Sequence, residues 1–275
     1  MGKTGRNVAR AADAAEDLTD SRAFILAARA GYIAAGILHL LIGAIALRVA
    51  FGGAGSADQS GALSQLDSSP GGTLLLWACF LGSTALALFL LGEVLFGANQ
   101  LRDRDRASFR AKNGVKAVVY ASIGSTFAFY ALGGSRDSSS STQATSTALM
   151  SHPAGAALLV AVGLGVMAVG GYFAYSGITR RFGKNLRGLP SGTAGKAFMG
   201  LGSAGYVAKG AALLVLGMLF VVATAKNNPA ESTGLDGALK SLQEQPFGAG
   251  ILGIIAAGLI AYGVFMVIRA RYQRM

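Results

Sequence analysis

The amino-acid sequence predicts an all-α integral membrane protein with six transmembrane helices, arranged as three parallel two-helix repeats. Three observations lead to this prediction: long apolar stretches, Lys and Arg residues concentrated in alternate connections, and internal sequence similarity. Of the 275 residues, 52% are hydrophobic and only 13% are charged, which is about half the charged share of an average soluble domain. Cys79 is the one cysteine of the sequence, so a disulfide-stabilised scaffold is excluded.

Six apolar stretches are long enough to cross a bilayer as helices. They lie at about 31–51, 72–97, 114–134, 154–177, 205–225 and 249–269. A helix rises about 1.5 Å per residue, so about 20 residues span the roughly 30 Å of bilayer hydrocarbon. The stretches are apolar on every side and do not alternate as the strands of a transmembrane barrel do. We therefore expect six transmembrane helices.

The basic residues indicate how these helices are oriented. The sequence has 24 Lys and Arg against 13 Asp and Glu, a formal net charge of +11. Most cations lie near the two termini and in the second and fourth connections, whereas the loops near 52–71, 135–153 and 226–248 together hold three cations and six acids. By the positive-inside rule, we expect a multi-pass protein of the bacterial plasma membrane with both termini in the cytoplasm. The basic face should attract anionic lipid head groups and is not a nucleic-acid footprint.

Internal similarity divides the chain into three copies of one unit. Residues 22–43 align with 196–217 without a gap. In a weaker middle copy, Gly124 takes the position of Gly43. The predicted organisation is a basic cytoplasmic arm at 1–21, followed by repeats at 22–101, 102–182 and 183–275, the last of which ends in a short basic C-terminus. Two crossings per repeat keep the copies parallel, which predicts a pseudo-threefold arrangement about the membrane normal.

A short amphipathic helix is predicted in each outer connection. Asp58 precedes a short apolar pattern that ends at Pro70, and Asp236 precedes a similar pattern that ends at Pro246. Asp is strongly favoured at helix N-caps, and proline commonly follows helix ends. We therefore expect Asp58 and Asp236 to cap these two outer helices.

The segments 28–32, 36–38 and 57–63, together with Gly43, resemble an actinobacterial membrane-protein family catalogued as domain of unknown function 1206. Members of that family look like tandem copies of this two-helix unit, commonly three, so the resemblance covers residues from about 22 to 272. The resemblance implies the repeated helical fold. It implies no activity, because the family carries none that could be transferred.

Five ionisable side chains in or near the predicted spans are candidate functional residues: His39, Glu93, Lys116, Lys209 and Arg269. Charge inside a bilayer is costly, so such groups often mark ion or substrate pathways. His39 could be a proton relay or a ligand-binding group. It could equally be a neutral imidazole hydrogen-bonded between helices, and we favour this structural role because its equivalents in the other repeats are Tyr120 and Leu213.

The repeat alignment places Glu93 at the level of Arg269, and it places Lys116 and Lys209 near the same membrane face. An ion pair between Glu93 and one of these three cations would lower the cost of holding an acid within the membrane. We expect such a pair to fix helix packing rather than to form a substrate site.

Glycines two helical turns apart mark one face of a helix in two of the repeats. These helix-packing candidates are Gly36, Gly43, Gly210 and Gly217. Small residues let helix backbones approach closely in a membrane, so we expect helix–helix contacts at these positions.

The sequence shows no catalytic, metal-binding or cofactor-binding constellation. Its two histidines, His39 and His152, fall in different parts of the predicted topology, and no set of Cys, His and carboxylate residues has metal-ligand spacing. We therefore expect a protein that is not an enzyme and that carries no cofactor.

The sequence favours a scaffold, a lipid-interacting protein or an accessory subunit of a larger membrane complex. Its candidate partners are membrane lipids, whose anionic head groups would lie at the cytoplasmic face, and another membrane protein. The alternative is a small ion or solute channel or transporter with a path between the repeats. Tandem repeats favour this alternative, but few intramembrane polar groups are present to line a path.

Overall fold

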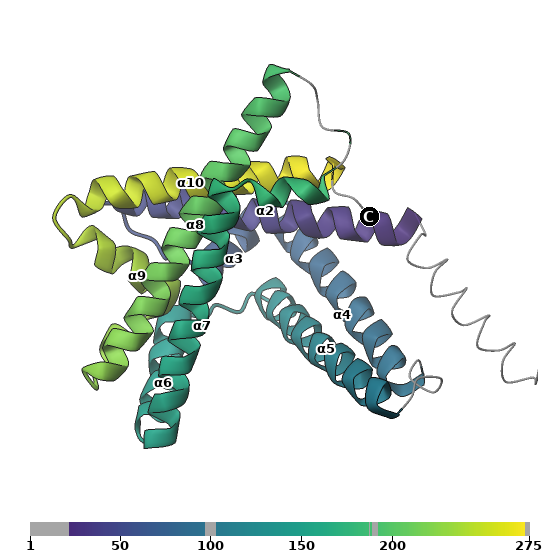
Figure 1. Ribbon diagram of the computed structural model, residues 1–275, viewed down its shortest axis with the longest axis horizontal. Helices are drawn as coiled ribbons and strands as arrows, with labels where there is room; N and C mark the ends of the chain where they lie inside the picture. The colour runs from purple at the N-terminus through teal and green to yellow at the C-terminus, as the bar shows by residue number, and fades with distance from the viewer. Residues whose placement is uncertain (1–21, 97–102, 187, 189–191, 273–275) are drawn as a thin grey trace, which may run out of the picture. The chain divides into compact units, whose positions relative to one another are not determined.

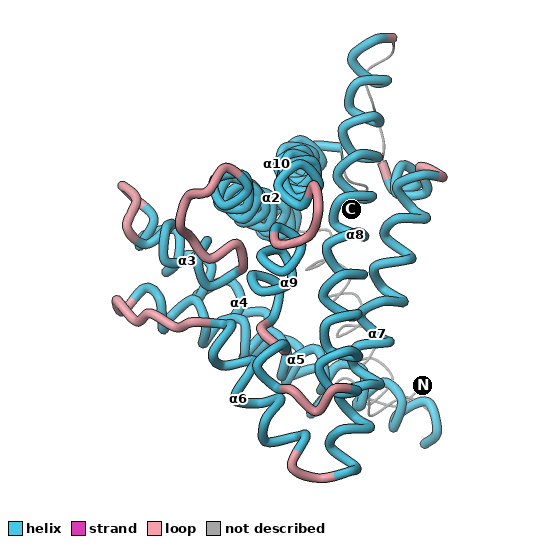
Figure 2. Tube along the Cα trace, turned by 90° about the vertical axis from the view of Figure 1, so that its left-hand side faces the viewer, coloured by secondary structure: helices cyan, strands magenta, loops and turns pink. Residues whose placement is uncertain are grey.

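The computed structural model describes residues 22–96, 103–186, 188 and 192–272, and every regular element in those ranges is a helix (Figure 2). The long helices are α2 (Arg22–Ala50), α4 (Gly72–Phe96), α5 (Asp103–Ala131), α7 (Pro153–Ile178), α8 (Thr193–Ala225) and α10 (Gly248–Tyr272). The short helices are α3 (Gln59–Asp67), α6 (Ser138–Met150) and α9 (Gly234–Gln243), with 3-10 turns η2 (Arg181–Asn185) and η3 (Pro229–Glu231). The predicted all-α class is confirmed, and the order long–short–long occurs three times.

Within the described ranges, five helices contain a segment that is long and apolar enough to cross a membrane. These segments are Gly31–Ala50, Gly72–Gly92, Pro153–Ile178, Thr193–Ala225 and Gly248–Tyr272. The sixth predicted span, at 114–134, is not among them. Most of this stretch lies in α5, which ends at Ala131. Helix α5 carries Lys116 together with polar residues such as Ser122 and Ser125. Its apolar part is therefore shorter and more polar than the sequence prediction assumed.

The described chain forms two compact units. Of the described residues, the first contains 22–31, 66–96 and 103–134, so its long helices are α4 and α5. These two helices lie side by side (Figure 1). A Cβ atom added to Gly124 on α5 would lie 3.2 Å from Thr84 Oγ1 on α4, so a small residue sits at this contact.

The second unit contains Tyr32–Gln65 and the chain from Ser135 onward. In it α2 runs alongside α10 (Figure 1), and the contact is made at Gly36 and Gly43. A Cβ atom at Gly36 would lie 2.8 Å from Gly263 O, and one at Gly43 would lie 2.8 Å from Ile260 N. Both positions therefore need a residue without a side chain, because the neighbouring backbone leaves no room.

The contact between α7 and α8 is built in the same way. A Cβ atom at Gly210 would lie 2.6 Å from Gly170 O, and one at Gly217 would lie 2.5 Å from Gly163 O. All four glycines selected from the sequence thus lie where two helix backbones nearly touch. Helix α8 also packs on α10, where Gly205 faces the backbone of Tyr262.

One rule describes the three helix pairs. The first long helix of each repeat packs on the second long helix of the preceding repeat in cyclic order: α5 on α4, α8 on α7, and α2 on α10. The residues at these contacts include Gly43, Gly124 and Gly217, which the repeat alignment equates. The internal similarity of the sequence therefore reflects an equivalent contact in each pair.

Two neighbouring glycines of α7 allow a test of this packing. A Cβ atom at Gly170 would lie 2.8 Å from Gly210 O, whereas one at Gly171 would have no atom within 4 Å. We expect Gly170→Ala to destabilise the protein by about 1–3 kcal/mol, because the helices must separate. Gly171→Ala should leave stability unchanged or slightly higher, because Ala favours helix over Gly. Unfolding in detergent, followed by circular dichroism, measures both, and equal stabilities would contradict the close contact.

Candidate functional site

Ionisable side chains of α2 and α8 meet inside the second unit. The Nζ atom of Lys209 lies 3.1 Å from Nε2 of His39, and Nδ1 of His39 lies 2.7 Å from the carbonyl oxygen of Ala35. A carbonyl oxygen can only accept a hydrogen bond, so Nδ1 carries the proton and donates to Ala35. The Nε2 atom then holds a lone pair and accepts a hydrogen bond from Lys209. The geometry therefore assigns a neutral imidazole to His39.

Aromatic rings enclose the rest of the Lys209 ammonium. Its Nζ atom lies 4.6 Å from the ring centroid of Tyr262 on α10 and 4.9 Å from that of Phe173 on α7. Both distances are typical of cation–π contacts. Among the described residues Lys209 forms no salt bridge, since the ion pairs found there are Lys226–Glu231 and Lys240–Asp236. Neutral groups from three other helices therefore hold this cation.

A second buried cation lies in the same aromatic surroundings. Arg269 on α10 is 9% exposed, and its Nη1 donates a hydrogen bond of 2.7 Å to the hydroxyl of Tyr206. Its guanidinium carbon lies 5.2 Å from the ring centroid of Tyr32. Tyr206 stacks on Phe182 with a centroid distance of 4.7 Å and contacts Tyr262 at 5.3 Å.

The residues of this buried cation cluster are Tyr32, His39, Phe173, Phe182, Tyr206, Lys209, Tyr262, Phe265 and Arg269. They come from α2, α7, η2, α8 and α10. The glycine contacts bring these helices close enough for the side chains to touch.

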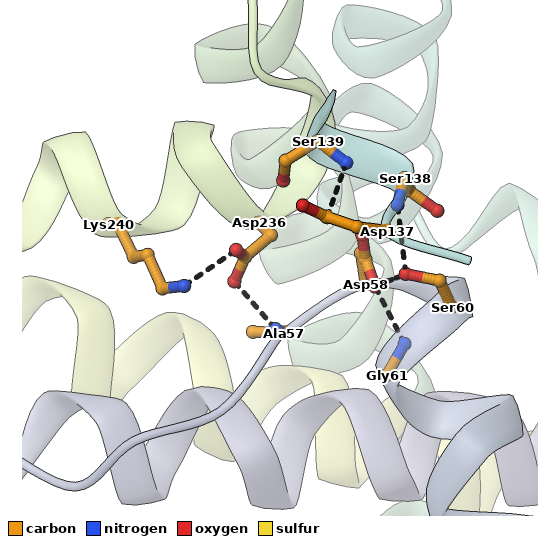
Figure 3. Close-up of polar contacts among 9 residues, drawn as sticks. All are labelled: Ala57, Asp58, Ser60, Gly61, Asp137, Ser138, Ser139, Asp236 and Lys240. Carbon is orange, nitrogen blue, oxygen red and sulfur yellow. Dashed lines mark hydrogen bonds and ion pairs between the residues drawn. The ribbon is translucent and has the colours of Figure 1, made fainter. Parts of the chain in front are cut away.

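A second polar group, the connecting-helix junction, joins α3, α6 and α9 (Figure 3). Asp58 is 3% exposed, and its Oδ1 accepts hydrogen bonds from Gly61 N at 2.9 Å and from Ser60 Oγ at 2.6 Å. Asp58 is thus the N-cap of α3, as its position in the sequence indicated. The Ser60 hydroxyl in turn accepts a hydrogen bond of 3.3 Å from Ser138 N, where α6 begins.

Asp236 does not cap its own helix, so the prediction for this residue is wrong. The N-cap of α9 is Thr233, and Asp236 lies in the first turn. Its Oδ1 accepts a hydrogen bond of 2.7 Å from Ala57 N, and its Oδ2 accepts one of 2.7 Å from Lys240 Nζ (Figure 3). Asp236 therefore ties the third repeat to the segment that precedes α3.

The repeat alignment explains why the two aspartates differ. Residues 61–63 correspond to 237–239, so Asp236 takes the position of Ser60 inside the helix and not that of Asp58 before it. A carboxylate at that position faces the neighbouring repeat and not its own first turn.

The middle repeat contributes Asp137 and Ser146 to the junction, in addition to Ser138. The Oδ1 atom of Asp137 accepts a hydrogen bond of 2.9 Å from Ser139 N and so caps α6. Further along α6, the buried hydroxyl of Ser146 lies 2.6 Å from that of Ser232, which precedes α9. All three connecting helices therefore share one hydrogen-bonded junction.

Comparison with known proteins identifies the repeated unit. The family described as Domain of Unknown Function (DUF1206) matches three tandem segments, residues 30–97, 111–180 and 204–273. The chain belongs to this family. It is also 29% identical over 252 residues to a Bacillus subtilis (strain 168) protein described as "Uncharacterized protein YxxB", and the alignment covers 90% of each chain. No solved structure matches the chain. The resemblance found in the sequence is thus confirmed.

In this DUF1206 protein the predicted candidates divide between the two units. His39, Lys209 and Arg269 come together in the buried cation cluster. Lys116 lies exposed on α5 in the first unit. The side chain of Glu93 lies outside the described residues, so its ion pair stays a prediction. In the described ranges no group of His, Cys, Asp or Glu side chains could hold a metal ion.

Sequence reasoning missed the aromatic partners of these cations. It predicted no contact of these cations with Tyr32, Tyr206 or Tyr262. Helical spacing carried the missing signal, because Tyr206 precedes Lys209 by three residues and Tyr262 precedes Arg269 by seven. Residues at these spacings share one helix face, so a tyrosine accompanies each cation on its own helix.

A double-mutant cycle tests the His39–Lys209 hydrogen bond. We expect His39→Phe and Lys209→Met each to destabilise the protein, and the double variant to lose less than the sum. The coupling should be about 0.6–1.7 kcal/mol, the range measured for hydrogen bonds between membrane helices. Pairing His39→Phe with Lys196→Met, an exposed cation of the same helix α8, should give additive changes. Additivity in both cycles would show that the hydrogen bond contributes nothing.

Substitutions at Asp236 test the junction. Asp236→Ala should destabilise the protein by about 1–3 kcal/mol, because the buried Ala57 N–H loses its acceptor. Asp236→Asn keeps an acceptor oxygen and should lose less than about 1 kcal/mol, since the half-exposed Lys240 contributes little. Glu244→Ala at the exposed end of α9 is the control. Chemical unfolding in detergent gives the three values, and equal losses for Asn and Ala would refute the proposed role of the Ala57 hydrogen bond.

Proposed function

We propose that this chain is a non-enzymatic, multi-pass protein of the bacterial plasma membrane that serves as a scaffold or accessory subunit and contacts anionic lipids. The observation that carries the proposal is the enclosure of Lys209. Side chains of α2, α7 and α10 surround its ammonium, so the most distinctive polar group of the described spans is used to hold helices together. A group used in this way supports a rigid, packed body.

The proposal includes six spans in three parallel repeats. The cyclic order of the helix pairs, with a glycine at each equivalent contact, supports a pseudo-threefold arrangement. It also supports α5 as the sixth span, because α5 holds the same place in its pair as α2 and α8 hold in theirs. Lys116 would then reach the cytoplasmic interface by extending its apolar stem.

The cytoplasmic face of the proposed topology is basic. The turn η2 between α7 and α8 carries the exposed cations Arg180, Arg181 and Lys184. The Arg181 guanidinium also lies 5.0 Å from the ring centroid of Tyr175, which holds it near the end of α7. Each cation near an anionic bilayer surface contributes about 1 kcal/mol of attraction, so this turn favours contact with anionic head groups.

A channel or transporter with a path between the repeats is the second candidate. The observation in its favour is the presence of His39 and Lys209 within predicted spans, where ionisable groups often serve transport. The packing favours the first candidate, because these groups bond to one another between closely packed helices.

Flux measurements separate the two candidates. We expect proteoliposomes containing the purified protein to pass protons, potassium and small solutes no faster than protein-free vesicles. A flux that is present in the unaltered protein and lost in His39→Phe would overturn the scaffold proposal. Reporter fusions supply the topology: one after Met275 should be cytoplasmic, and one within 226–248 should be external.

Replacement of the η2 cations tests the lipid contact. A variant with Gln at Arg180, Arg181 and Lys184 should bind phosphatidylglycerol roughly a hundredfold more weakly at low salt, as the loss of about three cation contacts predicts. Native mass spectrometry measures the bound lipid, with Lys226→Gln at the opposite end of α8 as the control. Equal binding by the triple variant and the control would contradict a lipid contact at this turn.

A further inference from the structure

A cavity of about 420 Å³ lies within the second unit, beside the point where α2 ends. Its walls are the last turns of α2, the loop at 54–56, the first turns of α3, and residues 135–137. Neither the buried cation cluster nor the basic turn η2 contributes to it. The cavity is therefore separate from the groups on which the proposed function rests.

Glycines give this cavity its shape. After α2 ends, the chain folds back so that Gly53 N donates a hydrogen bond of 2.9 Å to Arg48 O. A Cβ atom at Gly55 would lie 2.7 Å from Ile45 Cγ2, and one at Gly61 would clash with Ser56 O. The loop thus lies against both helices, and the hollow remains between them.

Hydrogen-bond donors line the hollow. Arg48, Ser56, Ser64 and Ser135 all belong to its wall, and the hydrogen bonds among the described residues do not involve their side chains. Arg136 supplies a second cation to the wall. Several residues with hydrogen-bond donors, two of them cations, therefore surround one small space.

Asp137 is the acidic residue of the wall, and part of its carboxylate is already engaged. Its Oδ1 accepts the hydrogen bond from Ser139 N that caps α6. With Arg48, Arg136 and Asp137 in the lining, the wall carries one net positive charge. Its electrostatics therefore favour an anion.

We propose that this cavity binds a phosphate group, held by the Arg48 guanidinium and the serine hydroxyls, with Arg136 as the second cation. A guanidinium presents parallel N–H donors that match two phosphate oxygens, and hydroxyls supply further donors. The volume falls in the range of small-ligand sites. Phosphate offers acceptors on all sides and so can accept hydrogen bonds from several of these donors at once.

The position of Arg48 allows two sources for this phosphate. Arg48 lies two residues before the end of the apolar segment Gly31–Ala50, and Ala44 and Ile45 give the cavity an apolar edge. If α2 spans the membrane, as the proposed function includes, the site lies at the edge of the hydrocarbon. A lipid head group could then enter from the bilayer, and a soluble phosphate compound from the aqueous side.

The test uses the full chain, purified in an uncharged detergent, and two kinds of probe. In one arm inorganic phosphate and glycerol 1-phosphate are titrated, and the thermal unfolding midpoint is recorded. In the other arm native mass spectrometry compares phosphatidylglycerol with diacylglycerol, which lacks phosphate. Saturable binding of the soluble probes supports an aqueous source. Binding of phosphatidylglycerol alone, where Arg48→Gln weakens it, supports a head group in this cavity.

Four variants make the assignment specific. Arg48→Gln should weaken binding about tenfold or more, because a charged hydrogen-bonding group is lost. Arg48→Lys should also weaken it, since Lys keeps the charge but loses the paired donors. Ser64→Ala should weaken it less, and Lys226→Gln, which replaces an exposed cation outside the cavity wall, should leave phosphate binding unchanged. Unfolding midpoints without ligand show whether each variant is folded.

The proposal would be overturned if no phosphate-bearing probe showed saturable binding, or if Arg48→Gln bound as well as the unaltered chain. Equal binding by Arg48→Lys would mean that Arg48 acts only as a charge at the interface, which also overturns a built site. None of these results decides the scaffold role, which the flux measurement tests independently, although a complete absence of phosphatidylglycerol binding would also contradict the lipid contact at η2.

Discussion

The arrangement of the second unit depends on how it holds the Lys209 ammonium. An unpaired charge is expensive to bury, and the described residues offer this one no carboxylate. The chain instead supplies a neutral imidazole and two aromatic faces, at 3.1, 4.6 and 4.9 Å. Because these three groups come from α2, α10 and α7, satisfying one charge requires three helices to meet on the fourth. Displacing any of them would leave the buried ammonium without one of its partners.

Such a meeting is possible only where helix backbones come unusually close. The glycine contacts of α2 with α10 and of α8 with α7 supply that proximity, since any Cβ atom there would strike backbone atoms. Tyr262 shows how the two constraints combine. Gly205 lies against its backbone, while its ring covers Lys209 and contacts His39 at a centroid distance of 4.8 Å. The close packing at glycines thus places the aromatic rings where they can enclose Lys209.

Much of this fold could be predicted from the sequence, because helix length, apolar content and repeated glycines are local properties. The cap at Asp58 is local too. The aromatic partners of Lys209 were not predictable in the same way, since they depend on how four helices rotate against one another. Asp236 fails for a related reason, because its acceptor role is fulfilled 179 residues away at Ala57. The sixth span at 114–134 is not among the apolar helices of the described residues, because Lys116 and the polar residues Ser122 and Ser125 interrupt it.

The repeats share their contacts but not their chemistry, and this contrast bears on function. The glycine contact occurs in all three helix pairs, yet His39 corresponds to Tyr120 and Leu213, and Lys209 corresponds to Ala35 and Lys116. A path along a threefold axis would be lined by equivalent residues from each copy, and unlike groups at equivalent positions would line it unevenly. The polar groups instead collect between α2, α8 and α10, which belong to the first and third repeats. The repeats therefore keep the glycine contact while their polar side chains differ. The bonded pairs His39–Lys209 and Tyr206–Arg269 come from the first and third repeats alone.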